Sequence, residues 1–303
     1  MLLPRGAKLA AAAAASTAES AATVRNAVLS VVYVSEGVNT ALLDTLADAA
    51  STTTKGAGLL RQFRDTTYHR TGYTIGGSCP SSVADASIEV SRRALRAIDL
   101  RMHEASHPRI GVVDHVSVHP LGQGAQEAAR EAGMAIARAL GAEGLPVLLY
   151  GDLKKGRGLA EVRRSTPYFS NGNLPEKIGA DLGPNEVDAS RGMVTVGCTP
   201  LVTNYNILLG TDDKRVAAQV TRSVREKDGG LRWVESLTLE REDGRYEAAC
   251  NLLRPKETTP AMVLDVAERK AALLGIEVVK AYETGLTEEQ AVAAVSRFLV
   301  ERG

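Results

Sequence analysis

Residues 110–118, Ile-Gly-Val-Val-Asp-His-Val-Ser-Val, contain five β-branched aliphatic side chains in nine positions. This density is typical of a strand buried inside a sheet, because branched side chains pack well on a pleated surface. Strict alternation places Asp114 on one face with the two later valines, and His115 on the other face. The face of His115 also carries the side chains of Ser117 and His119. The sequence therefore predicts a central strand on which Asp114 and His115 point in opposite directions.

The three residues His107, Pro108 and Arg109 lie immediately before this strand. Pro108 fixes its own φ and biases His107 toward an extended conformation, so the turn is stiff. An imidazole titrates near neutrality and can accept or give a proton. A guanidinium can hold a carboxylate through two parallel hydrogen bonds. We therefore expect His107 and Arg109 to be functional residues at the entrance of the strand.

The polar residues inside the strand have simpler structural interpretations. Asp114 is expected to be a buried carboxylate that accepts hydrogen bonds from backbone N–H groups or from an arginine. His115 and His119 are expected to pack under a helix with one hydrogen bond each. A zinc site on these two histidines is not expected, because four residues of strand separate them by about 13 Å.

The rest of the chain alternates apolar strands with amphipathic helices. The expected strands are 27–34, 57–63, 73–75, 110–118, 146–150, 193–198, 202–209, 233–239, 246–253 and 276–281, and the main expected helices are 80–104, 123–140, 212–225, 260–274 and 288–299. This order predicts an α/β (α+β) protein with two subdomains, each a mixed sheet covered by helices. An aperiodic segment at 154–184 suggests a boundary, giving a first subdomain at 28–184 and a second at 185–303.

Capping signals mark several helix ends. Asn39 precedes an apolar helical stripe and is a typical N-cap. Thr259 is followed by Pro260, which suits the first helical turn. Thr287 and Gln290 match a capping box, and Gly141 is expected to close the helix that starts at residue 123.

Charge and cysteine usage exclude several functional classes. Lysine plus arginine equals aspartate plus glutamate at 36 each, so electrostatics gives no support for binding nucleic acid or an anionic membrane surface. No apolar run approaches the roughly 20 residues of a membrane span. Cys79, Cys198 and Cys250 have no CxxC spacing. A disulfide framework or zinc site is therefore not expected, and a reducing compartment fits the chain.

Residues 1–27 differ in composition from the rest, with an alanine and serine run and no acid before Glu19. One interpretation is an organelle-targeting segment, and the other is a disordered alanine-rich extension. The expected location is accordingly the cytoplasm, or the mitochondrion or plastid if this leader is a transit peptide.

Several segments together resemble the formiminotransferase domain of formiminotransferase-cyclodeaminase, and in particular its stand-alone plant and algal members. The strongest is Ser106–Gly111 followed by Asp114, which is similar to the family's His-Pro-Arg-x-Gly-x-x-Asp segment. The other matching segments follow in the family's order: Ser35–Gly37, Arg70 with Tyr73-Thr74, Leu149–Gly151, Gly183-Pro184, Val196-Gly197, Asn204–Asn206 and Asn251-Leu252. The resemblance runs from about residue 27 to the end of the sequence.

This resemblance implies two α/β subdomains with a folate-binding cleft between them, and a homodimer. It implies an enzyme of one-carbon metabolism and histidine catabolism that transfers a formimino group from formiminoglutamate to tetrahydrofolate, its co-substrate. The family's general base corresponds to His107, in agreement with the choice made from the residues alone. A neutral imidazole suits this step, because the attacking folate nitrogen must lose a proton.

The resemblance also places other residues in the site. Arg70 and Arg109 are candidates for holding carboxylates or the pterin, and Asp114 belongs to the same motif. Asn204 is a candidate for the pterin's hydrogen-bonding edge, with bonding at the strand end as the alternative.

Two positions depart from the family pattern, because Tyr33 and His69 stand where its motifs have asparagine. A phenol cannot offer the donor and acceptor pair of an amide. These residues are candidates for substrate or folate contacts. They leave two hypotheses open, a folate-dependent one-carbon transferase and a folate-binding protein without turnover on the same scaffold.

Overall fold

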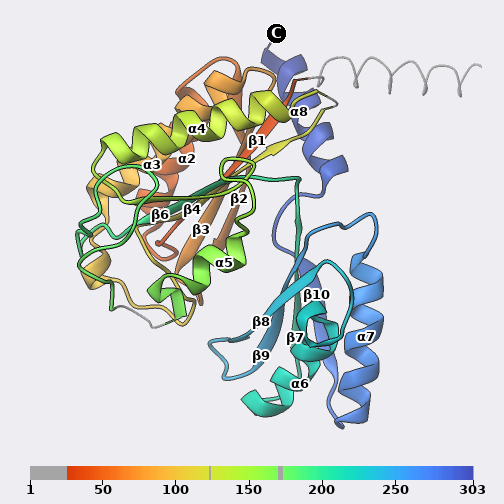
Figure 1. The fold of residues 1–303 in the computed structure, drawn as a ribbon. Coiled ribbons are helices and arrows are strands. Elements are labelled where there is room, and N and C mark those ends of the chain that lie inside the picture. Colours follow the sequence, from red (N-terminus) through yellow and green to blue (C-terminus); the bar gives the residue numbers. More distant parts are fainter. Residues whose placement is uncertain (1–25, 123, 170–172, 303) are drawn as a thin grey trace, which may run out of the picture.

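The computed structural model describes residues 26–122, 124–169 and 173–302. The expected leader lies outside the described residues apart from its last two positions. The described chain folds into two α/β subdomains, drawn one above the other in Figure 1. This confirms the predicted fold class. No helix of the described part is long and apolar enough to cross a membrane.

The first subdomain is built on a six-stranded mixed sheet. Its strands are β1 (Val28–Val34), β2 (Ala57–Asp65), β3 (Arg70–Gly77), β4 (Val113–Pro120), β5 (Val147–Gly151) and β6 (Val194–Cys198). Their order is β2-β3-β1-β4-β6-β5. The first four pair antiparallel, whereas β4, β6 and β5 run parallel. Helices α2 (Thr40–Thr52), α3 (Pro80–Ala97) and α4 (Gln126–Ala142) bury one face of this sheet in the main core.

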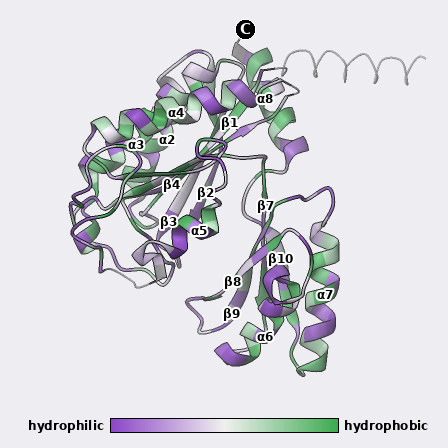
Figure 2. Cartoon of the chain, in the orientation of Figure 1, coloured by the Kyte–Doolittle hydropathy of each residue, from purple (hydrophilic) through white to green (hydrophobic). Residues whose placement is uncertain are grey.

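The second subdomain contains a four-stranded antiparallel sheet of order β10-β7-β9-β8. Its strands are β7 (Thr203–Leu209), β8 (Val234–Glu240), β9 (Tyr246–Leu252) and β10 (Val278–Glu283). Helices α6 (Lys214–Val224) and α7 (Pro260–Leu273) pack on one face. Figure 2 shows hydrophobic and hydrophilic residues alternating along α7, as an amphipathic helix requires. The last helix, α8 (Glu288–Arg302), returns to contact β2 and β3 of the first sheet.

The chain passes from the first sheet to the second between Cys198 and Thr203. The predicted boundary at 184 falls before β6, which in chain order is the last strand of the first sheet. The position of β6 is set by parallel pairing with β4 and β5, and such long-range pairing leaves no mark in the local sequence.

Most of the predicted caps are present. Asn39 accepts from Leu42 N–H at 3.1 Å, and Thr259 accepts from Met262 N–H at 3.3 Å. The capping box is reciprocal, since Thr287 N–H donates to Gln290 Oε1 at 3.1 Å and Gln290 N–H donates to Thr287 Oγ1 at 3.2 Å. The expected stop at Gly141 was wrong, because α4 continues to Ala142 and Gly144 takes the left-handed conformation with φ 86°.

The sides of the sheet toward which the side chains of β4 point also differ from the prediction. Tyr33 pairs with His115 but the next residue, Val34, pairs with Val113, so Asp114 is the extra residue of a β-bulge. The valines of β4 at positions 113, 116 and 118 all join the helix-covered core. Asp114 therefore lies on the same side as His115, toward two arginines, and the predicted opposition of the two residues was wrong.

The segment predicted to be aperiodic contains a short helix, α5 (Leu159–Arg164). In Figure 1 it lies on the face of the first sheet opposite α3 and α4. Its Val162 packs with Tyr150 of β5 in a small separate cluster. This face of the first sheet thus carries a helix that directs Arg163 toward Asp114 of β4.

Candidate active site

The segment that carries His107 is anchored at the ends of β1 and β6. Ser35 donates its hydroxyl to Gly111 C=O at 2.7 Å and its N–H to Val112 C=O at 2.8 Å. A Cβ on Gly111 would lie 2.1 Å from Met193 C=O, so only glycine permits this close approach. The His-Pro-Arg turn is therefore held by backbone contacts on both sides.

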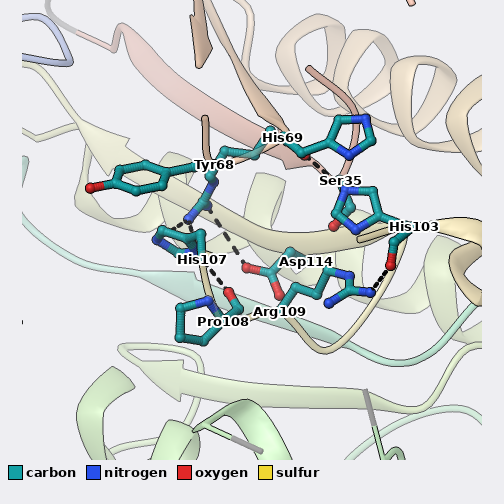
Figure 3. A pocket seen from close by; sticks show the side chains of 9 residues that line it. Ser35, Tyr68, His69, His103, His107, Pro108, Arg109 and Asp114 are labelled. Atoms are coloured by element: carbon teal, nitrogen blue, oxygen red, sulfur yellow. Dashed lines mark hydrogen bonds and ion pairs between the residues drawn. The ribbon is translucent and has the colours of Figure 1, made fainter. Parts of the chain in front are cut away.

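A small cavity of about 10 Å³ opens beside this turn, as Figure 3 shows. Its lining residues come from three segments that are distant in the sequence: Ser35, Tyr68, His69, Arg70, His103, His107, Pro108, Arg109 and Asp114. Five predicted site residues are brought together here, namely His69, Arg70, His107, Arg109 and Asp114. Tyr33 and Asn204 are not part of this lining.

His107 is held as a neutral imidazole with a defined tautomer. Its Nδ1–H donates to Pro108 C=O at 2.7 Å, because a carbonyl can only accept. Arg70 Nη1 lies 2.8 Å from Nε2 and 3.1 Å from Nδ1. Because Nδ1–H donates to Pro108 and a guanidinium can only donate, Nη1–H donates to Nε2. Burial lowers the pKa of His107 to about 3, and the positive charge of Arg70 acts in the same direction. The ring thus carries its lone pair on Nε2 throughout the neutral pH range.

Asp114 lies 3% exposed beside the histidine and binds a residue that the sequence did not suggest. Arg163 of α5 donates Nη1–H to Oδ1 at 3.2 Å and Nη2–H to Oδ2 at 3.1 Å. Ile110 N–H donates to Oδ1 at 2.8 Å, and Arg70 Nη2 lies 3.8 Å from Oδ2. Burial raises the pKa of Asp114, but the charges of Arg163 and Arg70 outweigh it and hold the pKa well below its ordinary value. Both expected kinds of partner, backbone N–H and arginine, are present.

Two guanidiniums thus face one carboxylate next to His107, which leaves a local excess of positive charge. Arg109 adds a third guanidinium, with Nη2–H donating to His103 C=O and a buried Nε that has no hydrogen-bond partner in the described structure. An excess of guanidinium groups in a partly buried site favours binding of a carboxylate.

Aromatic rings surround this charged cluster. Tyr68 packs against the imidazole of His107 with ring centroids 5.2 Å apart, and Tyr168 approaches it edge-on at 6.3 Å. The guanidinium of Arg163 lies 3.9 Å from the centroid of Tyr168. These rings cover part of the imidazole and limit its contact with water, and burial is the largest influence on its pKa.

Tyr33 and His69, which the resemblance predicts to replace asparagines of the family, are each engaged in contacts. The ring of Tyr33 lies under Arg70, 4.4 Å from the guanidinium carbon, and stacks on His115. His69 places Nε2 3.0 Å from Glu36 Oε1 and Nδ1 3.0 Å from Glu104 C=O. Tyr33 therefore supports Arg70 from below, while His69 forms part of the cavity wall.

Asn204 lies on β7 of the second subdomain, where its Nδ2–H donates to Asn251 Oδ1 at 2.6 Å. This is the hydrogen bonding at the strand end that was considered as its alternative. The ligand-binding roles assigned to Asn204, Tyr33, His69, Arg70 and Arg109 stay predictions.

The residues missed by sequence reasoning are Arg163, Tyr68, Tyr168 and a carboxylate of the second subdomain, Glu247. Arg163 could have been suspected from its Arg-Arg pair after Leu159–Val162, a stretch that is apolar apart from Glu161, combined with the need of Asp114 for a partner. Tyr68 and Glu247 gave no local signal, because they are 179 positions apart in the sequence. Tyr168 lies in the segment that was predicted to be aperiodic, which gave no signal for its contact with Arg163.

On the site face of the first sheet, His119 is buried and His115 is half-buried. His115 Nε2 lies 2.6 Å from the hydroxyl of Tyr150. His119 Nδ1–H donates to Thr199 C=O at 2.9 Å, which fixes the segment linking the two sheets. His119 has more hydrogen bonds than the single one expected, because Pro200 C=O and Ser117 also contact its ring. Within the described residues no group of three or more histidine, cysteine, aspartate or glutamate side chains could hold a metal ion.

Protonation of His119 should destabilise the protein in acid. Burial lowers its pKa to about 4 from 6.5, so the folded state binds fewer protons than the unfolded state between these values. The stability from the neutral ring is present above pH 6.5 and is lost as the pH falls toward 4, by about 3 kcal/mol. Urea unfolding across this range checks the slope. His119→Gln, which cannot titrate, should flatten it, and an unchanged slope would contradict the assignment.

The amino-acid sequence is similar to those of several known proteins of one class. The family profile described as the formiminotransferase domain, N-terminal subdomain, matches residues 27–199. A formiminotransferase cyclodeaminase-like protein of Arabidopsis thaliana is 34% identical over 278 residues, covering 86% of this chain and 93% of that protein. A glutamate formimidoyltransferase of Streptococcus pyogenes is 24% identical over 277 residues, covering 88% and 91%. The formimidoyltransferase-cyclodeaminase of Sus scrofa is 28% identical over 283 residues, covering 88% of this chain and 51% of that protein.

The two-subdomain fold and the buried histidine–arginine–carboxylate cluster are thus accompanied by similarity to transferases of formimino groups. This chain belongs to the formiminotransferase family, and its similarity extends over nearly the whole length of the plant relative.

Proposed function

We propose that this chain transfers a formimino group from formiminoglutamate to tetrahydrofolate, with His107 as the general base. The observation that carries the proposal is the state of His107, a neutral imidazole that lines the cavity and whose Nε2 accepts a hydrogen bond from Arg70. The names of the relatives, which include glutamate formimidoyltransferases, support the reaction class.

In the proposed reaction, one proton moves from the substrate to His107 and one proton then returns from His107 to the substrate. As the folate nitrogen bonds to the formimino carbon, the π pair of the C=N bond moves onto the imino nitrogen, and the folate nitrogen gives its proton to Nε2 of His107. The C=N bond then re-forms as the bond from that carbon to the glutamate nitrogen breaks, and the glutamate nitrogen takes the proton from the imidazolium. His107 ends the cycle neutral, as it began.

Arg70 has a second part in this proposal, because its Nη1–H occupies the lone pair that the base needs. A carboxylate of the glutamate-derived donor offers Arg70 a stronger, charged acceptor than the imidazole. Binding of the donor would therefore draw Arg70 away and free Nε2 for proton transfer. Tyr33, stacked beneath the guanidinium, supports Arg70 in the position where it donates to His107.

A second candidate function is folate binding without turnover, favoured by Tyr33 in place of the family's asparagine. Calorimetric titration of the purified protein with tetrahydrofolate, followed by a transfer assay with formiminoglutamate on the same sample, separates the two. We expect saturable binding with one site per chain, and turnover. Binding without turnover would support the second candidate, and absence of both would contradict the proposed function.

A further inference from the structure

The carboxylate of Glu247 is the most deeply buried charge between the two subdomains. It lies on β9 with no exposed surface, on the sheet face opposite α6 and α7. Tyr68 of the first subdomain donates its hydroxyl to Oε1 at 2.5 Å, and Asn206 of β7 donates to the same oxygen at 2.7 Å. Tyr282 of β10 donates to Oε2 at 2.9 Å. A charge buried so completely persists only when such donors are in place.

Arg241, just after β8, reaches the same part of the first subdomain. Its Nη1–H donates to Asp65 Oδ2 at 2.9 Å, and its guanidinium lies 4.8 Å from the ring centroid of Tyr68. Asp65 Oδ1 in turn accepts from Tyr68 N–H at 2.9 Å. Glu247 and Arg241 therefore hold both the ring and the backbone of Tyr68 from across the subdomain boundary.

The turn that they hold leads directly to His107. Tyr68 lies in the turn of residues 66–69 between β2 and β3, and its ring packs 5.2 Å from that of His107. Arg70, two residues later, donates to Nε2 of His107. Figure 3 shows Tyr68 and His107 side by side at the cavity. A displacement of this turn would move both Tyr68, which packs on the imidazole, and Arg70, which donates a hydrogen bond to it.

We propose that Glu247 and Arg241 are positioning residues through which the second subdomain sets the placement of His107. Neither touches the imidazole, and both act through Tyr68 and the β2–β3 turn. The catalytic consequence rests on the proposed function, whereas the coupling between the subdomains does not. Burial raises the pKa of Tyr68, and the neighbouring Glu247 carboxylate raises it further, so the phenol keeps the proton that it donates.

The test compares Glu247→Gln and Arg241→Gln with a matched control, Arg245→Gln. Arg245 lies in the same β8–β9 hairpin but pairs with the exposed Asp243. The first readout is the titration of His107 by NMR of protein with isotope-labelled histidine, with the signal assigned from His107→Gln. The second is the separation of kcat from KM in the transfer assay.

We expect both site variants to let water reach His107, so that its pKa rises from about 3 toward 6.5. The value of kcat should fall by about 10- to 100-fold with little change in KM, because a misplaced base affects the chemical step. Arg245→Gln should change neither quantity.

Tyr68→Phe covers the case in which a charge variant does not fold, since it removes only the hydroxyl that reaches Glu247. It should reproduce the rise in the pKa of His107. A titration of His107 that is unchanged in the folded variants would overturn the inference. If the wild-type protein binds folate without transferring a formimino group, the proposed function fails, while the titration still decides the coupling.

Discussion

His107→Ala should lower the rate of formimino transfer by about 10²- to 10⁴-fold, the range expected for loss of a general base. Calorimetric binding of tetrahydrofolate should persist, because the aromatic and arginine groups around the site remain. The free energy of unfolding should change little, since His107 is partly exposed and lies in a turn held by Ser35 and Gly111. A transfer assay and urea unfolding on the same preparations provide the comparison.

Imidazole added to the His107→Ala protein gives a sharper result. If His107 supplies the base, free imidazole should restore part of the transfer rate in proportion to its concentration. Met102→Ala is the matched control, because Met102 is 82% exposed on the same connecting segment. It should transfer at the wild-type rate and show no response to imidazole. Wild-type transfer by His107→Ala itself would remove His107 from the mechanism.

The features that depend on residues near one another in the sequence were predicted most accurately. The order of strands and helices, the caps at Asn39 and Thr259, and the capping box at Thr287 all depend on groups within a few positions. Their energetics are local, so one sequence is sufficient to place them. The gathering of His107, Arg70 and Asp114 came from a second source, the resemblance to a family.

The bulge at Asp114 shows where periodicity fails. A period of two assumes one residue opposite one residue, and the pairing of β4 with β1 breaks that rule between Tyr33 and Val34. The bulge turns Asp114 away from the core and toward Arg163 and Arg70. Nothing in Val-Val-Asp-His-Val itself marks the extra residue, because the register depends on β1 and on the arginines that receive the carboxylate.

Contacts between the two subdomains could not be predicted from the sequence for a related reason. Tyr68 and Glu247 are separated by 179 positions, and each alone has an ordinary interpretation as a turn tyrosine or a strand glutamate. Glu247 is a buried charge, and Tyr68 is held over His107, only because the fold brings the two residues into contact. A site assembled at such a boundary draws its geometry from both sheets, so neither half of the sequence contains the pattern.

Arg163→Met should lower the free energy of unfolding at pH 7 by about 3–5 kcal/mol, because it leaves the buried carboxylate of Asp114 without its main partner. Arg70 cannot replace it at 3.8 Å while it also donates to His107. The pKa of Asp114 should rise as well, since the charge of Arg163 is the largest influence that lowers it. Urea unfolding at pH 7 measures the loss of stability.

The double variant Asp114→Asn with Arg163→Met separates pairing from packing. Removing both charges should recover a large part of the lost stability, because no unpaired charge is then left in the interior. Arg130→Met is the control, since its pair with Glu127 is exposed and such pairs contribute about 1 kcal/mol or less. A double variant no more stable than Arg163→Met alone would mean that Arg163 stabilises the fold by packing on Tyr168 and not by pairing with Asp114.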